Sequence, residues 1–349
     1  MLWKGLALAG AVILWINTAF AQPEPMMVRS RTDQFTVFGL PQANSSRANS
    51  LMGMAQTEGG GYQFWLRPNS IGAITNSSVY LEPGLVAVSC ERIKEALLRE
   101  LKAADTRDRR IYIQINNRLQ QHQTRIVADR YERGWMYGVE LPSKLDEHFY
   151  SATILQVLLY EMANRHSPEH QVDPPEWLIS GMVSYLQGTT LQSLSIQPNA
   201  AITRVQVKMD SLSKARQTFE QDLPLTFEEL SWPDDLSKER AALFRDSAHL
   251  FVHELLHLKE GRESMRQFIQ DLSKHRNWQF ALLRAYPKYF NELADIEKWW
   301  ALNFVNFMGR DASQLWTLEE SWKQLKTALD VTMHVQLDAD RLPVTADYN

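Results

Sequence analysis

The sequence is poor in cysteine, because Cys90 is the only one among 349 residues. A single cysteine cannot form a disulfide within the chain, so small domains held together by disulfides are excluded and stability must come from a hydrophobic core. Cys90 falls in an apolar helical pattern without any motif that would activate its thiol. We therefore expect Cys90 to be a small buried side chain.

An excess of positive charge is also missing. The formal net charge is -4 and the isoelectric point is about 6.2, so the chain has no general means of neutralising a phosphate backbone, and we expect no nucleic-acid partner. Glycine (15 residues) and proline (14 residues) are too few for a collagen-like or low-complexity chain. The 44% of hydrophobic residues suits a globular protein with one or two compact units.

No apolar run is long enough to cross a membrane. The run from about residue 5 to 16 is shorter than the roughly 20 residues that a spanning helix needs. It follows Lys4 and precedes Ala19-Phe20-Ala21, which has small residues where a signal peptidase reads. We expect a secretory signal peptide cleaved after Ala21, and a periplasmic or extracellular protein without a stable membrane anchor.

Several motifs of common enzyme classes are absent as well. The sequence contains no Gly-x-Ser-x-Gly elbow, no phosphate-binding glycine loop, no Cys-x-x-Cys pair and no dinucleotide fingerprint. The residues that carry chemistry are therefore sought on the helices that contain histidine and glutamate.

The hydrophobic pattern predicts an α+β fold with a strand-rich N-terminal lobe followed by a mostly helical C-terminal lobe. We expect loops at 22–32 and 41–61, strands at 34–40, 110–116, 124–130 and 134–141, and a helix at 83–103. Further helices are expected at 146–165, 175–187, 238–259, 262–272, 278–285, 291–308 and 313–329. The predicted divisions are a signal peptide (1–21), an N-terminal lobe (22–145), a helical lobe (146–310) and a C-terminal helix with a tail (311–349).

Residues 151–188 read SATILQVLLYEMANRHSPEHQVDPPEWLISGMVSYLQG, which predicts a long helix, a polar loop and a second helix. This arrangement resembles the core of thermolysin-like (gluzincin, peptidase MA-like) metallopeptidases. In that family the first helix carries His-Glu-x-x-His and the second a Glu within Trp-Leu-x-Glu-Gly. The two histidines and the second Glu hold zinc, and the first Glu is the general base. The resemblance implies a gluzincin-like fold.

In this chain the expected metal ligands are replaced. Tyr160 and Asn164 stand at the two histidine positions, Ser180 stands at the second Glu, and Glu161 is retained. A phenol, an amide and a hydroxyl cannot together replace two imidazoles and a carboxylate as zinc ligands. The resemblance therefore implies a site without metal or catalysis, whose vestigial pocket comprises Tyr160, Glu161, Asn164, Trp177 and Ser180.

Other interpretations of the same residues stay open. Glu161 could form an ordinary helical ion pair with Arg165 one turn later, or it could do acid or base work with Tyr160 without a metal. Trp177 and Tyr185 suit a core position. More weakly, the whole pattern, including EKWWAL at 297–302, is similar to a group of exported bacterial proteins of unknown activity.

A literal His-Glu-x-x-His occurs elsewhere, at His253 to His257, with a chance probability of roughly one in a hundred. His249, His253 and His257 share the polar face of the predicted helix, opposite an apolar stripe, and such a face lies in solvent by default. No Trp-x-x-Glu-Gly segment follows to supply a third ligand. The alternative to the non-catalytic interpretation is an active zinc peptidase with His253 and His257 as ligands and Glu254 as base, which requires this face to line a cleft.

These observations predict an exported protein with a degenerate, non-catalytic gluzincin-like domain. Its expected role is to bind a peptide or protein partner, or to act as a scaffold, in the cell envelope. We expect no cofactor; the alternative requires zinc.

Overall fold

The computed structural model describes residues 26–39, 62–65, 78–106, 111–120, 123–131, 134–165, 171–189, 212–233, 238–275, 277–309, 318–329, 332–335 and 344–347. The predicted signal peptide at 1–21 and the predicted loop at 41–61 lie outside the described residues.

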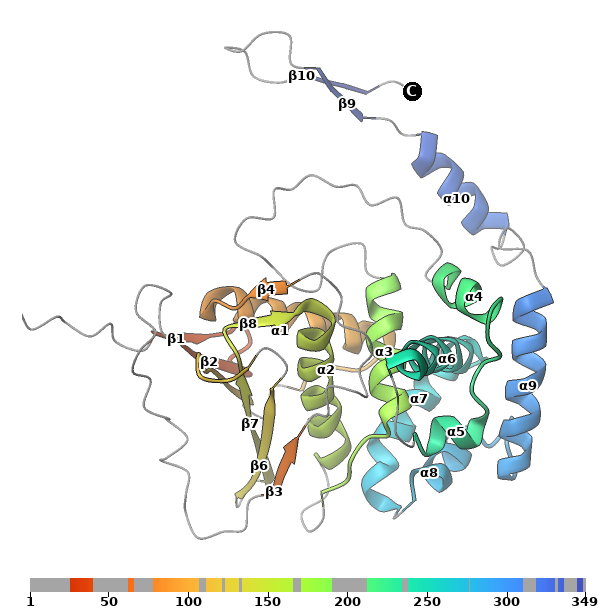
Figure 1. Ribbon diagram of the computed structural model, residues 1–349, viewed down its shortest axis with the longest axis horizontal. Coiled ribbons are helices and arrows are strands. Elements are labelled where there is room, and N and C mark those ends of the chain that lie inside the picture. The colour runs from red at the N-terminus through yellow and green to blue at the C-terminus, as the bar shows by residue number, and fades with distance from the viewer. Residues whose placement is uncertain are drawn as a thin grey trace, which may run out of the picture.

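The N-terminal part of the fold is a mixed sheet of six strands (Figure 1). Its order is β1-β2-β5-β7-β6-β3; β5 is parallel to β2 and β7, and the other neighbours are antiparallel. The strands are β1 (Met26–Arg29), β2 (Phe35–Gly39), β3 (Tyr62–Trp65), β5 (Ile111–Ile115), β6 (Arg125–Tyr131) and β7 (Gly134–Leu141). Ile111, Ile113 and Ile115 are all buried, as the alternation along this strand predicts.

Two helices of equal length accompany the sheet, namely α1 (Pro83–Glu100) and α2 (Glu147–Asn164). Pro83 stands at the start of α1, where its missing N–H costs no hydrogen bond. The side chain of Asp146 caps α2 by accepting from the Phe149 N–H at 3.1 Å. Helix α2 contacts α1, β7 and α3, and it is buried on every side, as its apolar sequence requires. Strands β4 (Ser78–Tyr80) and β8 (Lys144–Asp146) form a separate antiparallel pair.

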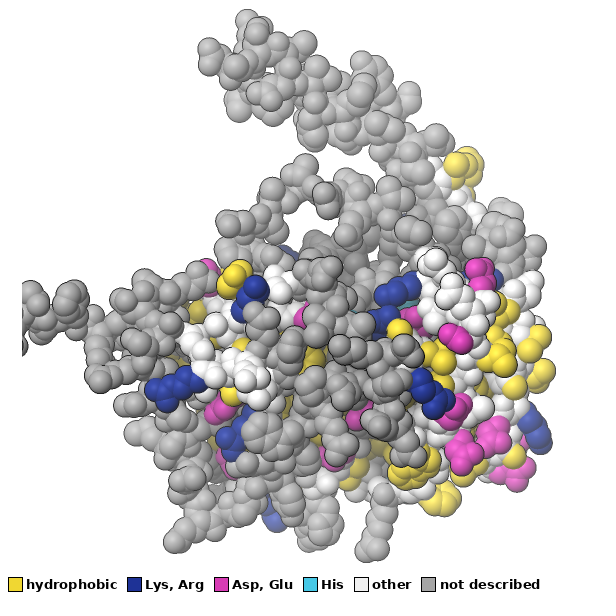
Figure 2. All heavy atoms as spheres, in the orientation of Figure 1, with side chains coloured by type: hydrophobic (Ala, Val, Ile, Leu, Met, Phe, Trp, Pro, Cys, Tyr) yellow, Lys and Arg dark blue, Asp and Glu magenta, His cyan; other side chains and the backbone are white. Residues whose placement is uncertain are grey.

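The C-terminal part is helical, and α6 lies in its middle with α3, α4, α5 and α7 packed against it (Figure 1). The helices are α3 (Glu176–Thr189), α4 (Ser213–Phe219), α5 (Phe227–Ser231), α6 (Lys238–His257), α7 (Gly261–Asp271), η2 (Leu272–Lys274), α8 (Trp278–Ala285), α9 (Leu293–Gly309) and α10 (Leu318–Leu329). A hairpin of β9 (Thr332–Val335) and β10 (Val344–Asp347) follows. Hydrophobic side chains gather at the edge of the molecule where α9 lies (Figure 2), and Leu302 and Val305 of this helix are exposed.

Helices α3 and α6 approach each other closely at Gly181. A Cβ atom at this position would lie 2.4 Å from the Ala248 carbonyl oxygen and 2.5 Å from Val252 Cγ2, so no larger residue fits without moving a helix. Beside this contact, Trp177 of α3 packs edge-on against Phe251 of α6 with ring centroids 5.0 Å apart. This helix pair positions both segments that the sequence marks as candidate sites.

The α+β class and most predicted elements are confirmed, and some local predictions are wrong. The predicted loop at 22–32 contains strand β1, and strands occur beyond residue 142 in β8, β9 and β10. The short helices α4 and α5 were not predicted, although Thr226 and Glu229 form a capping box at the start of α5. Cys90 is fully buried, as predicted, and burial raises the pKa of its thiol to about 12.

Candidate functional site

Asn164, which the sequence resemblance aligns with the second histidine of the peptidases, is bound to the backbone of a neighbouring loop. Its side-chain carbonyl accepts from the Val172 N–H at 2.7 Å, and its amide nitrogen donates to the Val172 carbonyl at 3.0 Å. The same nitrogen donates to the Tyr160 carbonyl at 3.0 Å. Asn164 is completely buried, and this set of bonds connects the end of α2 to the segment that leads into α3. We call this arrangement the Asn164 clamp.

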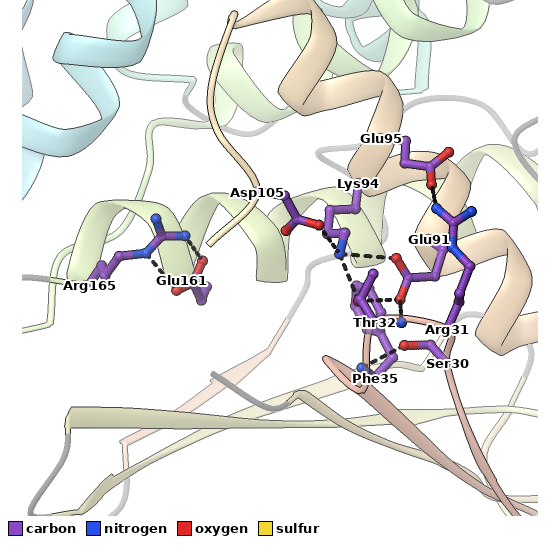
Figure 3. A network of polar contacts seen from close by, with 10 residues as sticks. All are labelled: Ser30, Arg31, Thr32, Phe35, Glu91, Lys94, Glu95, Asp105, Glu161 and Arg165. Atoms are coloured by element: carbon purple, nitrogen blue, oxygen red, sulfur yellow. Dashed lines mark hydrogen bonds and ion pairs between the residues drawn. The ribbon is translucent and has the colours of Figure 1, made fainter. Parts of the chain in front are cut away.

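Glu161, which the sequence resemblance aligns with the general base of the peptidases, is paired with Arg165. The guanidinium donates through Nε to one carboxylate oxygen at 2.9 Å and through a terminal nitrogen to the other at 2.6 Å. Figure 3 shows the two side chains facing each other on one side of α2. Glu161 is almost fully buried and Arg165 is partly exposed. The helical ion pair considered from the sequence is therefore present, and it is bidentate.

Tyr160, which the sequence resemblance aligns with the first histidine of the peptidases, belongs to the interior between α2 and the sheet. Its ring stacks on that of Tyr137 of β7 with centroids 6.3 Å apart, and its carbonyl accepts from the Tyr137 hydroxyl at 3.1 Å. Burial raises the pKa of the Tyr160 phenol, and the Asp173 carboxylate acts in the same direction. Burial also raises the pKa of Asp173. The Tyr160 phenol is thus held in its neutral form.

Trp177 and Ser180 on α3 are core residues. Trp177 is surrounded by aromatic rings, with Phe268 and Trp278 at centroid distances of 5.8 and 5.6 Å. Ser180 is buried, and its hydroxyl makes no hydrogen bond with any described residue. All five residues of the predicted vestigial pocket are 3% exposed or less. The structure brings Tyr160 and Asn164 together through one hydrogen bond, while Glu161 bonds to Arg165 and Trp177 packs among aromatic rings.

The second candidate is the histidine face of α6, formed by His249, His253 and His257 at successive turns. The rings of His253 and His257 are stacked, with centroids 4.0 Å apart and planes inclined by 26°. His257 donates through Nδ1 to the His253 carbonyl at 2.7 Å. His253 Nδ1 lies 3.2 Å from a carboxylate oxygen of Glu254.

Tyr185 of α3 lies against this histidine pair, with its ring centroid 6.1 Å from that of His253 and 6.3 Å from that of His257. Its hydroxyl donates to Glu100 at 3.2 Å, and Arg262 contacts the same carboxylate oxygen at 3.2 Å. Burial, followed by the nearby Glu100 carboxylate, raises the pKa of Tyr185 to about 12. An anchored aromatic ring therefore forms one wall beside the two imidazoles.

The expectation that the polar face of α6 lies in solvent is wrong for most of its length. His249 is 4% exposed, the side chain of His253 is 23% exposed, and only His257 at the helix end is exposed. The reason is that α6 is a central helix with neighbours on several sides, and Tyr185 of α3 packs against the rings of His253 and His257. Burial lowers the pKa of His249 to about 3, and His253 and Arg245 act in the same direction.

His148 at the start of α2 is a residue that the sequence did not single out. Its Nδ1 lies 3.0 Å from the side-chain oxygen of Gln187 on α3, and burial lowers its pKa. Within the described residues, Nε2 of His148 and Nε2 of His249 make no hydrogen bond. The spacing of the α6 histidines is visible in the sequence, but their proximity to Tyr185 depends on the packing of separate helices.

Neither the α2–α3 residues nor the histidine face of α6 supplies all the ligands that the zinc ion of a peptidase needs. In the part of the chain that the structure describes, no three His, Cys, Asp or Glu side chains are grouped so that they could hold a metal ion. At α2 and α3 the donors are an amide, a hydroxyl and a phenol that are committed to packing or hydrogen bonds. At the end of α6, His253 and His257 supply two imidazoles, and the Glu254 carboxylate contacts His253 at Nδ1.

Comparisons with models of known protein families, with curated proteins and with solved structures yield no match. The resemblance to thermolysin-like peptidases therefore rests on the residues quoted from the sequence and stays a prediction. Among the described helices, none combines the length and apolar character that a membrane span requires.

Proposed function

We propose that this protein is an exported, non-catalytic relative of thermolysin-like metallopeptidases that binds a peptide or protein partner in the cell envelope. The single observation that carries the non-catalytic part is the Asn164 clamp, in which a residue at a metal-ligand position is fully engaged with the backbone of Val172. Export rests on the signal-peptide pattern ending at Ala21.

The burial of the family positions supports this proposal. A zinc peptidase keeps one coordination position open for water and substrate, whereas Tyr160, Glu161 and Ser180 are 3% exposed or less. A general base needs a lone pair directed at a water molecule, whereas both oxygens of Glu161 accept from Arg165. Catalysis here would require breaking a bidentate ion pair in the interior.

The experiment is a peptidase assay on the untagged mature chain, with a mixture of fluorogenic peptides and with zinc, cobalt or manganese added in turn. We expect no hydrolysis above that of the metal alone, in the wild type or in Glu161→Gln. Metal-dependent hydrolysis that Glu161→Gln abolishes would overturn the proposal. Glu229→Gln is a matched control, because Glu229 is a surface carboxylate that caps α5 and pairs with Arg240.

An active zinc peptidase at His253, His257 and Glu254 is the second candidate. It is favoured by one observation, namely that this face packs partly against Tyr185 instead of standing in open solvent. It predicts one zinc ion per chain that survives dialysis against a mild chelator and peptide hydrolysis that Glu254→Gln abolishes. Mass spectrometry for metal content together with the same assay separates it from the first proposal.

A further inference from the structure

The histidine pair at the end of α6 has a defined protonation pattern. The His253 carbonyl can only accept a hydrogen bond, so Nδ1 of His257 carries the proton in the 2.7 Å contact between them. The Glu254 carboxylate, when ionised, is likewise an acceptor for Nδ1 of His253 at 3.2 Å. A neutral imidazole with its proton on Nδ1 has its lone pair on Nε2. Both rings are thus arranged with Nε2 as the acceptor atom.

Neither Nε2 atom makes a hydrogen bond with a described residue. The described hydrogen bonds of His253 and His257 all involve Nδ1 or the His253 carbonyl. The side chain of His253 is 23% exposed and His257 is exposed, so solvent and small ions reach the pair. By contrast, His249 one turn earlier is buried.

The spacing of the two rings suits a shared ion. Two imidazole nitrogens that bind one divalent ion at about 2.0–2.1 Å each lie at most about 4.2 Å apart. The ring centroids of His253 and His257 are 4.0 Å apart and the planes are nearly parallel, so small rotations of the side chains bring this spacing within reach. The rings are backed by Tyr185, whose hydroxyl is anchored on Glu100.

The position on the helix also favours a cation. His257 is the last residue of α6, and the unpaired carbonyl groups at the C-terminal end of a helix carry partial negative charge. A metal-binding histidine usually donates its other ring N–H to a carboxylate or a carbonyl, which fixes the ring and increases its basicity. His253 has such a carboxylate in Glu254, and His257 has such a carbonyl in the preceding turn.

We propose that His253 and His257 form a two-imidazole site for a divalent transition metal, with Glu254 as an orienting carboxylate and the remaining coordination positions open to water or to a donor from a partner molecule. Imidazole ligands and the general order of affinities place copper(II) above nickel(II) and zinc(II) at such a site. This site goes beyond the proposed function and does not depend on it. It differs from the zinc-peptidase alternative in the role of Glu254, which here positions His253.

The test is a titration of the untagged mature chain with copper(II), followed by electron paramagnetic resonance and by calorimetry. We expect one copper per chain with hyperfine coupling to two imidazole nitrogens. His253→Ala and His257→Ala should each weaken binding at least tenfold. Glu254→Gln should weaken it by about 10–100-fold, the usual effect of losing a carboxylate that orients a ligand. His275→Ala, which changes a histidine outside α6, should leave the affinity unchanged.

Thermal unfolding of each variant in the absence of metal checks that the fold is retained. The proposal is overturned if copper does not bind, or if the double variant of His253 and His257 binds it as the wild type does. Equal affinity of wild type and Glu254→Gln would overturn the orienting role. Copper binding without peptide hydrolysis leaves the proposed function intact, and hydrolysis that depends on Glu161 would overturn that function without affecting this site.

Discussion

The α2–α3 segment and the C-terminal end of α6 differ in how well the sequence pattern agrees with the availability of the polar side chains. The α2–α3 segment resembles a peptidase core in the order and spacing of its residues, yet the side chains of Asn164 and Glu161 are bonded inside the protein, to Val172 and to Arg165. The end of α6 is not followed by a Trp-x-x-Glu-Gly segment, yet it presents two imidazoles whose Nε2 atoms make no hydrogen bond with a described residue. Spacing along a helix therefore suggests a resemblance, whereas the partners of each polar atom decide what it can bind.

The difference follows from where each segment lies. Helix α2 is enclosed by the sheet, α1 and α3, so a polar group on it must find a partner inside the protein. Helix α6 is enclosed along most of its length and emerges from the core at its last turn, where His257 is exposed. Groups at that turn can be satisfied by water or by a ligand.

The largest expected effect is that of Gly181→Ala, which breaks the contact that holds both segments in place. The added methyl group would meet the Ala248 carbonyl and Val252, so the helices must separate. We expect a loss of about 3 kcal/mol or more in the free energy of unfolding, measured by chemical denaturation. Gly84→Ala in α1 is the matched control, since its Cβ would meet no atom within 4 Å and alanine is the better helix former. Equal effects of the two changes would refute the close approach of α3 and α6.

Asn164→Ala should have the next largest effect. It leaves the N–H and the carbonyl of Val172 without their partner in a partly buried setting, which costs about 2–3 kcal/mol of unfolding free energy. The matched control is Asn303→Ala in α9, because Asn303 makes only the corresponding bond to the carbonyl four residues earlier, at 2.8 Å from Trp299. We expect that control to cost less than about 1 kcal/mol. Similar losses for both variants in urea unfolding would show that the Asn164 clamp does not stabilise the fold.

The smallest expected effect, counted per pH unit, is the loss of stability in acid that His148 and His249 cause. Their folded-state pKa values are lowered by burial, with Arg245 acting in the same direction on both and His253 on His249. Lys214 also lowers the pKa of His148, while Gln187 and Asp146 oppose the shift. The unfolded chain therefore binds more protons than the folded protein once the pH falls below the ordinary histidine pKa of about 6.5.

Their contribution to stability is complete above about pH 6.5 and is lost as the pH falls toward the lowered pKa values, which for His249 is about 3. The expected slope is at most about 1.4 kcal/mol per pH unit for each histidine. Urea unfolding of the wild type and of His249→Gln between pH 7 and pH 4 measures it. His249→Gln should flatten the curve, and parallel curves for the two proteins would contradict the buried neutral state of His249.

Much of the local structure could be predicted, because it depends on neighbours along the chain. Strand β7 and helix α8 begin and end at the predicted residues, and the Pro83 start of α1 follows from helix chemistry. Strand β1 was missed because its four residues show no alternation and it is stabilised by pairing with β2. The short helices α4 and α5 pack against α6, and α5 also packs against α3 and α9, which local sequence does not reveal.

In the candidate sites, too, contacts within one helix could be predicted and contacts that depend on tertiary packing could not. The Glu161–Arg165 pair lies within one helix, so the sequence was sufficient to suggest it. The Asn164 clamp joins residues eight positions apart across a helix end, and its geometry depends on the path of the loop. The burial of His249 depends on the other helices that pack around α6, which the sequence of α6 alone does not reveal.

By itself, the sequence determined the fold class, the burial of Cys90, and which side chains share a face of each helix, because these follow from composition and from the helical repeat. Only the tertiary structure decided which of those faces are covered. Helix α3 packs on α6 through Gly181 and places Tyr185 against His253 and His257, while His257 at the helix end stays exposed. The cost of burying a polar group without a partner then determines that Asn164 is bonded inside the protein, while His253 and His257 keep Nε2 available.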